Sequence, residues 1–234
     1  MVRALLFDFN GVLVDDEPIH LELFQKVLAE EGVSLERDDY FAHYLGFDDR
    51  GCFQAVLERA GRPATPEQIS RLIARKATYY QERIREQGFP AFPGAVRLVR
   101  QAHQAGLMLG VVSGALRSEV LGALEKLGLE GLFKAVVAAE DVRASKPSPE
   151  GYRKGLEQLN SLPPLPSRLI HPHEVLAIED APAGLEAAAG AGLATLGVAH
   201  TYPAAALSAA DRVVESLAEV ELSDLLGPRS AAVD

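Results

Sequence analysis

Short apolar runs alternate with helical stretches along most of this chain. The first run, residues 4–7, contains no polar residue and ends at Asp8, and Gly11 provides for a turn soon after it. Further apolar runs predict strands over residues 107–112, 135–138, 175–178, 194–198 and 212–214. Helical spacing predicts helices over residues 95–105, 117–127, 149–159 and 182–190. This alternation is typical of a parallel sheet whose strands are joined by crossover helices.

The segment from residue 18 to about residue 87 follows a different pattern. Apolar residues recur there at helical spacing, and no strand-like run is present. The sequence therefore predicts an α/β fold, a doubly wound parallel sheet over residues 1–15 and 90–234 with an inserted all-helical cap domain over residues 16–89. A lid of this kind excludes water from a site at the strand ends.

Polar side chains stand at or just after the ends of four predicted strands. They are Asp8 with Asn10, Ser113 with Gly114, Lys146 with Pro147, and Glu179 with Asp180. Because the carboxyl ends of parallel strands meet at one edge of a sheet, we expect these groups to lie together. They offer a nucleophile, oxyanion donors, a fixed cation and magnesium ligands, which are the groups that metal-assisted phosphoryl transfer needs.

Each of these groups taken alone also has a plain structural interpretation. Ser113 and Gly114 suit a turn, Lys146 suits a solvated loop, and Asp180 suits a helix N-cap. Asp8 fits such an interpretation least, because an unpaired charge at the end of a buried strand is costly. The four groups in combination favour a catalytic site.

Composition narrows the class of partner and the compartment. The chain has 23 Lys and Arg against 33 Asp and Glu, a net charge of −10, which argues against binding to nucleic acid or an anionic membrane. Cys52 is the single cysteine, so an internal disulfide is impossible and a reducing compartment is expected. With no targeting or spanning segment in sight, we expect a cytoplasmic protein, a monomer, with a small-molecule partner.

Four segments carry motifs in a fixed order. They are residues 8–15 (DFNGVLVD), 111–114 (VVSG), 146–149 (KPSP) and 178–185 (IEDAPAGL). In these motifs the chain resembles the haloacid dehalogenase superfamily along nearly its whole length. It is most similar in character to the branch of β-phosphoglucomutase-like and CbbY-like sugar-phosphate enzymes, whose helical cap is inserted directly after the first motif.

The resemblance implies a role for each matching residue. Asp8 is expected to be the nucleophile that carries a phospho-aspartyl intermediate, and Ser113 and the amide of Gly114 are expected to hold the phosphoryl oxygens. Lys146 is expected to neutralise Asp8 and the phosphoryl charge.

The resemblance also implies Mg²⁺ as the cofactor. Its expected ligands are Asp8, the main-chain carbonyl of Asn10, and Asp180 together with Glu179. Oxygen ligands and water are the coordination that Mg²⁺ prefers.

Residue 10 departs from the family pattern. Phosphatases and phosphomutases of the family have Asp at this position, where it protonates the leaving oxygen and later activates water, and Asn10 can do neither. A positioned acid or base contributes roughly 10²- to 10⁴-fold to a rate, so turnover should be depressed by about that factor. Three explanations stay open: an engineered Asp→Asn trap, a natural enzyme with slow turnover, or a different reaction.

Substrate choice in capped enzymes of this kind depends on the insert. The residues of interest are Glu17, His20, Tyr44, Gly46, Arg50 and Lys76. His20 is similar to a family position that braces the acid/base residue, and a surface histidine is the alternative. Arg50 suits a second phosphate or a sugar carboxylate, and a solvated arginine is the alternative. Arg117, at the start of a predicted helix, faces either the site or solvent.

The function expected from these observations is a Mg²⁺-dependent phosphatase that acts on a small phosphate ester. Hexose or pentose phosphate fits a small cap best, and phosphoglycolate and nucleotide monophosphates remain open. The alternatives are a β-phosphoglucomutase-type mutase, a 2-haloacid dehalogenase, and a phosphate-binding protein that has lost turnover through Asn10.

Overall fold

The computed structural model describes residues 1–88 and 90–226. The chain divides into two compact units, Met1–Asp15 with Pro90–Asp234, and Asp16–Phe89. We call the first the core unit and the second the helical unit. The end of the predicted core domain, residues 227–234, lies outside the described residues.

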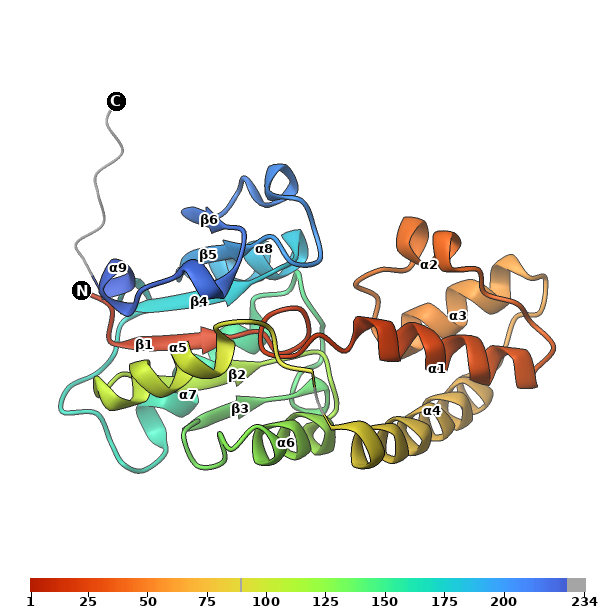
Figure 1. The fold of residues 1–234 in the computed structure, drawn as a ribbon, viewed down its shortest axis with the longest axis horizontal. Coiled ribbons are helices and arrows are strands. Elements are labelled where there is room, and N and C mark those ends of the chain that lie inside the picture. Colours follow the sequence, from red (N-terminus) through yellow and green to blue (C-terminus); the bar gives the residue numbers. More distant parts are fainter. Residues whose placement is uncertain (89, 227–234) are drawn as a thin grey trace. The chain divides into compact units, whose positions relative to one another are not determined.

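A parallel sheet forms the centre of the core unit (Figure 1). Its strands are β1 (Ala4–Phe7), β2 (Met108–Val112), β3 (Ala135–Val137), β4 (Val175–Glu179), β5 (Ala194–Val198) and β6 (Arg212–Val214). The order among the described residues is β3-β2-β1-β4-β5-β6, and each neighbouring pair is parallel. The predicted doubly wound sheet is therefore confirmed.

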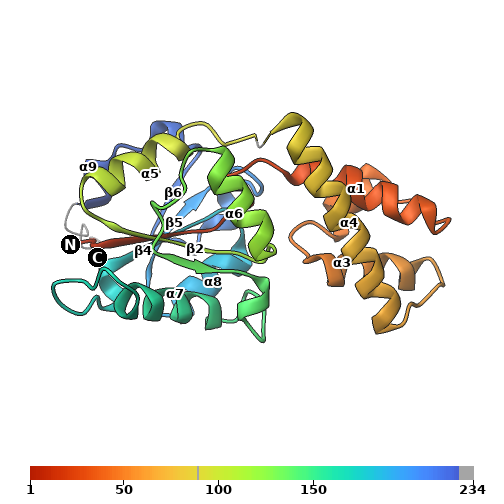
Figure 2. The same cartoon turned by 90° about the horizontal axis from the view of Figure 1, so that it is seen from below.

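Helices cover both faces of the sheet (Figure 2). On one face lie α5 (Ala95–Gln104) and α6 (Arg117–Lys126), and on the other lie α7 (Glu150–Ser161) and α8 (Pro182–Gly190). The side chains of β1 are completely buried, as expected for a central parallel strand with helices on both faces. Short elements complete the unit: η1 (Ala139–Asp141), η2 (Pro172–Glu174), η3 (Ala204–Leu207), η4 (Leu217–Glu219) and α9 (Leu222–Leu226).

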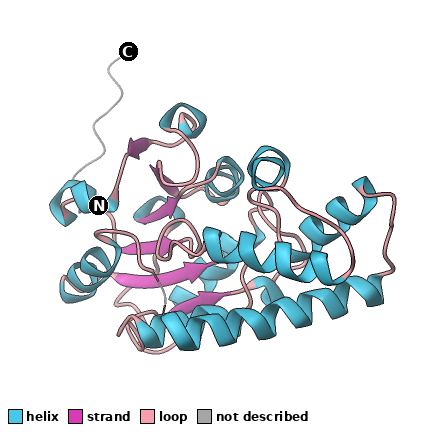
Figure 3. Ribbon diagram, turned by 45° about the vertical axis from the view of Figure 1, so that its right-hand side comes forward, coloured by secondary structure: helices cyan, strands magenta, loops and turns pink. Residues whose placement is uncertain are grey.

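The helical unit consists of α1 (Glu17–Glu30), α2 (Arg37–His43), α3 (Asp49–Arg59) and α4 (Pro66–Gln87). No strand occurs in residues 16–88, and Figure 3 shows only helices and loops in this part of the chain. Its apolar core is built around Phe24 and Phe53, whose rings meet edge to face with centroids 5.0 Å apart. Thr65 begins α4 through a capping box with Gln68.

β1 is a central strand, with β2 on one side of it and β4 on the other. Phe7 pairs with Val111 of β2 on one side and with Ile178 of β4 on the other. In an open α/β sheet, ligands bind at the carboxyl ends of the strands beside such a switch point. In residues 1–88 and 90–226, no helix has the length and apolar character that crossing a membrane requires.

Candidate active site

Three charged side chains meet at the carboxyl ends of β1 and β4. Lys146 Nζ lies 2.8 Å from Asp8 Oδ1 and 2.7 Å from Glu179 Oε1, so one ammonium bridges two carboxylates. The Glu179 side chain is completely buried, and that of Asp8 is 12% exposed. The strand ends and the loop before α7 thus bring Lys146 and Glu179 to Asp8, although both lie more than a hundred positions from it in the sequence.

The main chain holds Asp8 in place. Its N–H donates to the carbonyl of Ile178 at 2.9 Å, which continues the ladder between β1 and β4. Its carboxylate accepts from the N–H of Phe9 at 2.8 Å through the same Oδ1 that faces Lys146. Asp8 therefore keeps one oxygen in a fixed electropositive contact.

Burial and mutual repulsion set the protonation of the acidic groups. Burial raises the pKa of Glu179, the charge of Asp8 raises it further, and Lys146 opposes both effects. Burial and Asp8 likewise raise the pKa of Asp180. Burial lowers the pKa of Lys146, but the carboxylates of Asp8 and Glu179 together outweigh it, so its pKa is raised and the ammonium persists.

The donor set fits a hard divalent cation. One carboxylate oxygen from each of Asp8, Glu179 and Asp180 can be chosen so that all three lie within 4.8 Å of one another. Lys146 is the basic side chain that the structure pairs with this cluster, so three carboxylates share one ammonium. The buried Oε2 of Glu179 has no hydrogen-bond partner within the described residues. A buried, unpartnered carboxylate oxygen in an acidic cluster favours Mg²⁺.

Asp180 is packed against the loop that follows Asp8. A β-carbon on Gly11 would stand 1.9 Å from Asp180 Oδ2 and 2.9 Å from Thr201 Oγ1, so this position has room for glycine alone. Gly11 also has φ +78°, a conformation that other residues rarely adopt. Thr201 hydrogen-bonds the Asp180 carboxylate, and His200 Nδ1 donates to the carbonyl of Gly11 at 2.9 Å.

Ser113 and Gly114 lie at the end of β2, as predicted. The Ser113 side chain is buried, and its hydroxyl accepts from the N–H of Ala115 at 2.9 Å. Ser113, Gly114 and Lys146 line a common cavity of about 30 Å³. The structure thus brings the three predicted phosphate-binding residues to one place.

Asn10 is partly exposed and lies in the turn that follows β1. Its main chain forms a parallel β-bridge with that of Val14, and the N–H of Gly11 donates to the carbonyl of Val14 at 2.9 Å. The turn is thus closed by main-chain bonds. Its roles in catalysis and in metal binding stay predictions.

In the helical unit, His20 belongs to a buried polar chain. Lys76 Nζ lies 2.7 Å from His20 Nδ1 and 2.6 Å from Asp49 Oδ1, and its side chain is 1% exposed. An ammonium can only donate, so Nδ1 accepts and the ring proton resides on Nε2, 3.1 Å from Asp16 Oδ2. The structure thus engages both ring nitrogens of His20, and its bracing role stays a prediction.

The other predicted residues of the insert lie in different surroundings. Glu17 accepts from the hydroxyl of Tyr40 at 2.5 Å, and Tyr44 is buried. Gly46 has φ +82° and Arg50 is exposed. In the core unit, Arg117 is engaged by Asp141 and by the carbonyl of Val136, so its guanidinium anchors η1 and β3. The role of Arg50 toward a substrate stays a prediction.

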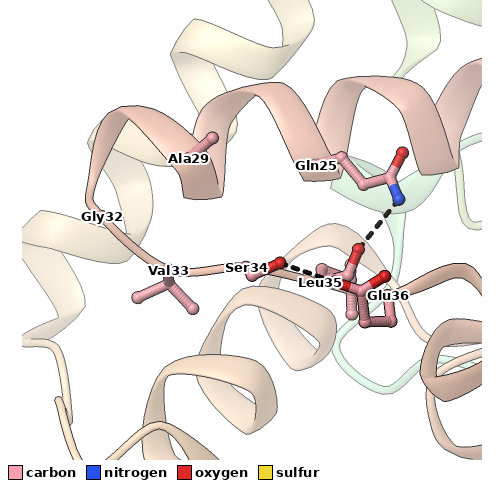
Figure 4. A pocket seen from close by; sticks show the side chains of 7 residues that line it. All are labelled: Gln25, Ala29, Gly32, Val33, Ser34, Leu35 and Glu36. Carbon is pink, nitrogen blue, oxygen red and sulfur yellow. Dashed lines mark hydrogen bonds between the residues drawn. The ribbon is translucent and has the colours of Figure 1, made fainter.

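A larger surface hollow of about 440 Å³ lies in the helical unit, where α1 gives way to α2 (Figure 4). Its polar groups already bond one another: Gln25 Nε2 donates to the carbonyl of Leu35 at 2.8 Å, and Ser34 Oγ to Glu36 Oε1 at 2.9 Å. The hollow offers no group of the chemistry predicted above.

Sequence reasoning missed Tyr152, Gly184 and Thr201, which contact the acidic cluster directly. The hydroxyl of Tyr152 donates to Glu179 Oε1, and a β-carbon on Gly184 would stand 2.0 Å from Glu179 Oε2. A signal was available for Tyr152, which shares the inward face of α7 with Gly155 and Leu159. A buried tyrosine on an inward face needs a partner for its hydroxyl.

Comparison with known proteins agrees with the four motifs. The family model described as haloacid dehalogenase-like hydrolase matches residues 5–198. Validoxylamine A 7'-phosphate phosphatase from Streptomyces hygroscopicus subsp. limoneus is 30% identical over 226 residues, which cover 94% of this chain and 96% of that protein. The phosphorylated carbohydrates phosphatase of Thermotoga maritima is 27% identical over 202 residues, with 86% and 87% covered.

A solved structure of a related protein is similar to this chain over almost its whole length. It is an aspartate-to-asparagine mutant of CbbY from Rhodobacter sphaeroides in complex with xylulose-(1,5)-bisphosphate. It superimposes with a TM-score of 0.84 at 27% identity and covers 96% of this chain and 99% of that one. The chain is therefore an enzyme of the haloacid dehalogenase-like hydrolase family.

Proposed function

We propose that this protein is a phosphatase that transfers the phosphoryl group of a small phosphorylated carbohydrate to Asp8 and then to water. The observation that carries the proposal is the bridge from Lys146 to Asp8 and Glu179 at the switch point of the sheet. A carboxylate held beside a permanent ammonium, next to a cavity lined by Ser113 and Gly114, suits attack on phosphorus better than it suits a structural ion pair.

In the first step an oxygen of Asp8 forms a bond to phosphorus as the ester oxygen leaves with its electron pair. The Lys146 ammonium offsets the charge that collects on the phosphoryl oxygens. Ser113 and the N–H of Gly114 bind those oxygens and set the line of attack. In the second step water attacks the phosphorus of the aspartyl phosphate, inorganic phosphate leaves, and the Asp8 carboxylate is regenerated.

We propose Mg²⁺ as the cofactor, held by Asp8, Asp180, Glu179 and the carbonyl of Asn10. When bound it supplies positive charge beside the phosphoryl group and a fixed coordination geometry. The acidic cluster needs such a charge, since burial and Asp8 raise the pKa of both Glu179 and Asp180.

Asn10 slows both steps. Its amide cannot give a proton to the leaving oxygen, so departure relies on solvent, and it cannot take a proton from the attacking water. We therefore propose slow turnover and an aspartyl phosphate that survives long enough to be trapped. The related CbbY mutant that was captured with a bisphosphate also carries asparagine in place of an aspartate.

The substrate class follows from the relatives and from the insert. One relative is named a validoxylamine A 7'-phosphate phosphatase and another a phosphorylated carbohydrates phosphatase, and the CbbY mutant is in complex with xylulose-(1,5)-bisphosphate. We propose that the helical unit selects the substrate and that exposed Arg50 binds a second anionic group. His20 is proposed to brace the insert, because both of its ring nitrogens are engaged within it.

The test is the release of inorganic phosphate from hexose, pentose and pentulose phosphates, phosphoglycolate and nucleotide monophosphates, with and without Mg²⁺. Acid-quenched samples are digested and searched for phosphorylated Asp8. Phosphate release together with phosphorylated Asp8, called the label on Asp8 below, supports the proposal. Isomerised sugar phosphate with no release indicates a mutase, and chloride release from 2-haloacids without Mg²⁺ indicates a dehalogenase. Tight ester binding with no label on Asp8 indicates a binding protein.

A further inference from the structure

Tyr152 reaches the acidic cluster from the side of the sheet that α7 covers. Its side chain is completely buried and its hydroxyl donates to Glu179 Oε1. The Lys146 ammonium lies 2.7 Å from the same oxygen and 5.6 Å from the centre of the Tyr152 ring. Oε1 therefore receives two donors from α7 and the loop before it.

The second oxygen of Glu179 is in the opposite situation. Oε2 is buried and has no hydrogen-bond partner among the described residues. It fits against α8 only because residue 184 is glycine, where a β-carbon would stand 2.0 Å from Oε2. Oε1 thus accepts from two donors, whereas Oε2 accepts from none of the described residues. This difference fixes the orientation of the carboxylate.

We infer that Tyr152 is a positioning residue that holds Glu179 so that its second oxygen is presented to the cation of the site. This role rests on the proposed function, since it needs a cation among Asp8, Glu179 and Asp180. Packing alone does not require the hydroxyl, because phenylalanine would fill the same space. Partners that orient a metal-binding carboxylate typically contribute about 10- to 100-fold to metal affinity.

The experiment is a titration of Mn²⁺, a paramagnetic stand-in for Mg²⁺, followed by electron paramagnetic resonance with competition by Mg²⁺. The variant is Tyr152→Phe. The matched control is Tyr40→Phe, which removes a tyrosine–glutamate bond of 2.5 Å from a buried tyrosine in the helical unit. Tyr152→Phe should weaken Mn²⁺ binding by about 10-fold or more, and Tyr40→Phe should leave it unchanged.

A second pair of variants tests the orientation of the Glu179 carboxylate independently of Tyr152. Gly184→Ala places a β-carbon 2.0 Å from Glu179 Oε2 and 2.3 Å from Oε1, so it must displace the whole carboxylate and should weaken Mn²⁺ binding as well. Gly190→Ala in the same helix meets only Pro149, at 3.4 Å, and should not. If urea unfolding shows that Tyr152→Phe does not fold, the comparison of Gly184→Ala with Gly190→Ala decides whether the orientation of Glu179 matters for Mn²⁺ binding.

The outcomes separate the positioning role from the proposed function. If the unmodified protein binds Mn²⁺ and both Tyr152→Phe and Gly184→Ala bind it equally well, the positioning role is wrong and the proposed cation site stands. If the unmodified protein binds no Mn²⁺ and releases no phosphate, the proposed function fails and the positioning role falls with it. Weaker binding in Tyr152→Phe with unchanged binding in Tyr40→Phe supports the inference.

Discussion

Gly11 and Asp180 lie so close together that a β-carbon on residue 11 would stand 1.9 Å from Asp180 Oδ2. Asp180 sits at 4% exposure and is also held by Thr201, so it has little room to retreat. The turn after β1 and the carboxylate after β4 are therefore fitted to each other. A change in one should disturb the other.

Gly11→Ala should abolish Mn²⁺ binding and phosphate release, because the new methyl group displaces the Asp180 carboxylate. Gly61→Ala is the matched control, since Gly61 has φ +69° but no atom within 4 Å of an added β-carbon. Both variants should lose about 1 to 2 kcal/mol of unfolding free energy from the backbone conformation. Urea unfolding and Mn²⁺ titration measure the two effects. Equal Mn²⁺ binding in the two variants would contradict the expected displacement.

Asn10→Asp should increase phosphate release from the best substrate by about 10²-fold or more, because a carboxyl group can protonate the leaving oxygen and then activate water. The amount of trapped aspartyl phosphate should fall at the same time. Rates are measured on freshly purified protein whose residue 10 is checked by peptide mass mapping, because an Asn-Gly sequence deamidates to Asp. An Asp form that is no faster would show that another group performs the proton transfer.

Lys146→Met should abolish labelling of Asp8 and destabilise the core unit. Removing the ammonium leaves Asp8 and Glu179 without their counter-charge, which costs about 3 to 5 kcal/mol when one partner of a buried pair is lost. The cost should shrink as the pH falls, because burial raises the pKa of Glu179 and this carboxylate then takes up a proton. Lys154→Met is the control: it removes a half-exposed helical pair with Glu150 and a bond to the carbonyl of Asp141, and it should cost less than Lys146→Met. Similar urea curves for both variants would exclude the bridge as a stabilising contact.

Glu174 should make folding stability depend on acid pH. Its carboxylate is held by Arg168 and the N–H of His171, which lower its pKa to about 2 from an ordinary value of 4.5. A lowered folded pKa gives stability that is present above pH 4.5 and is lost as the pH falls toward 2. Glu174→Gln should thus be less stable than the parent at pH 6, with a gap that narrows by pH 3. A gap of constant size in urea unfolding would rule this out.

The fold was largely predictable because its apolar runs are short and sharply bounded. The predicted helix over residues 182–190 has the bounds of α8, since Pro182 suits the first turn of a helix. The predicted strand over residues 175–178 ends one residue early, because β4 includes Glu179. A glutamate at the end of a strand resembles a loop residue in the sequence. Its complete burial depends on partners from α7 and the preceding loop, which no local pattern reveals.

The candidate site was predictable only where its residues follow strands. Parallel topology brings Asp8, Ser113, Lys146 and Asp180 to one edge, and the order of the motifs indicates this without any contact being known. Tyr152 contacts the site from the face of a helix, which depends on the angle at which α7 packs. The protonation of the cluster likewise depends on burial and mutual distance, which the sequence does not contain.

The two connections that carry the helical unit are joined to each other by main-chain bonds. The N–H of Asp15 donates to the carbonyl of Pro90 at 2.8 Å, and Val14 bridges Ala91 in antiparallel fashion. Whatever chain lies between them, β1 and the turn after it keep the same support. The main-chain support of β1 and of the turn after it therefore comes from residues outside the helical unit, and an exchanged or enlarged insert should leave that support in place. The bonds between residues 14–15 and 90–91 therefore also mark where a different insert could be joined to the core unit.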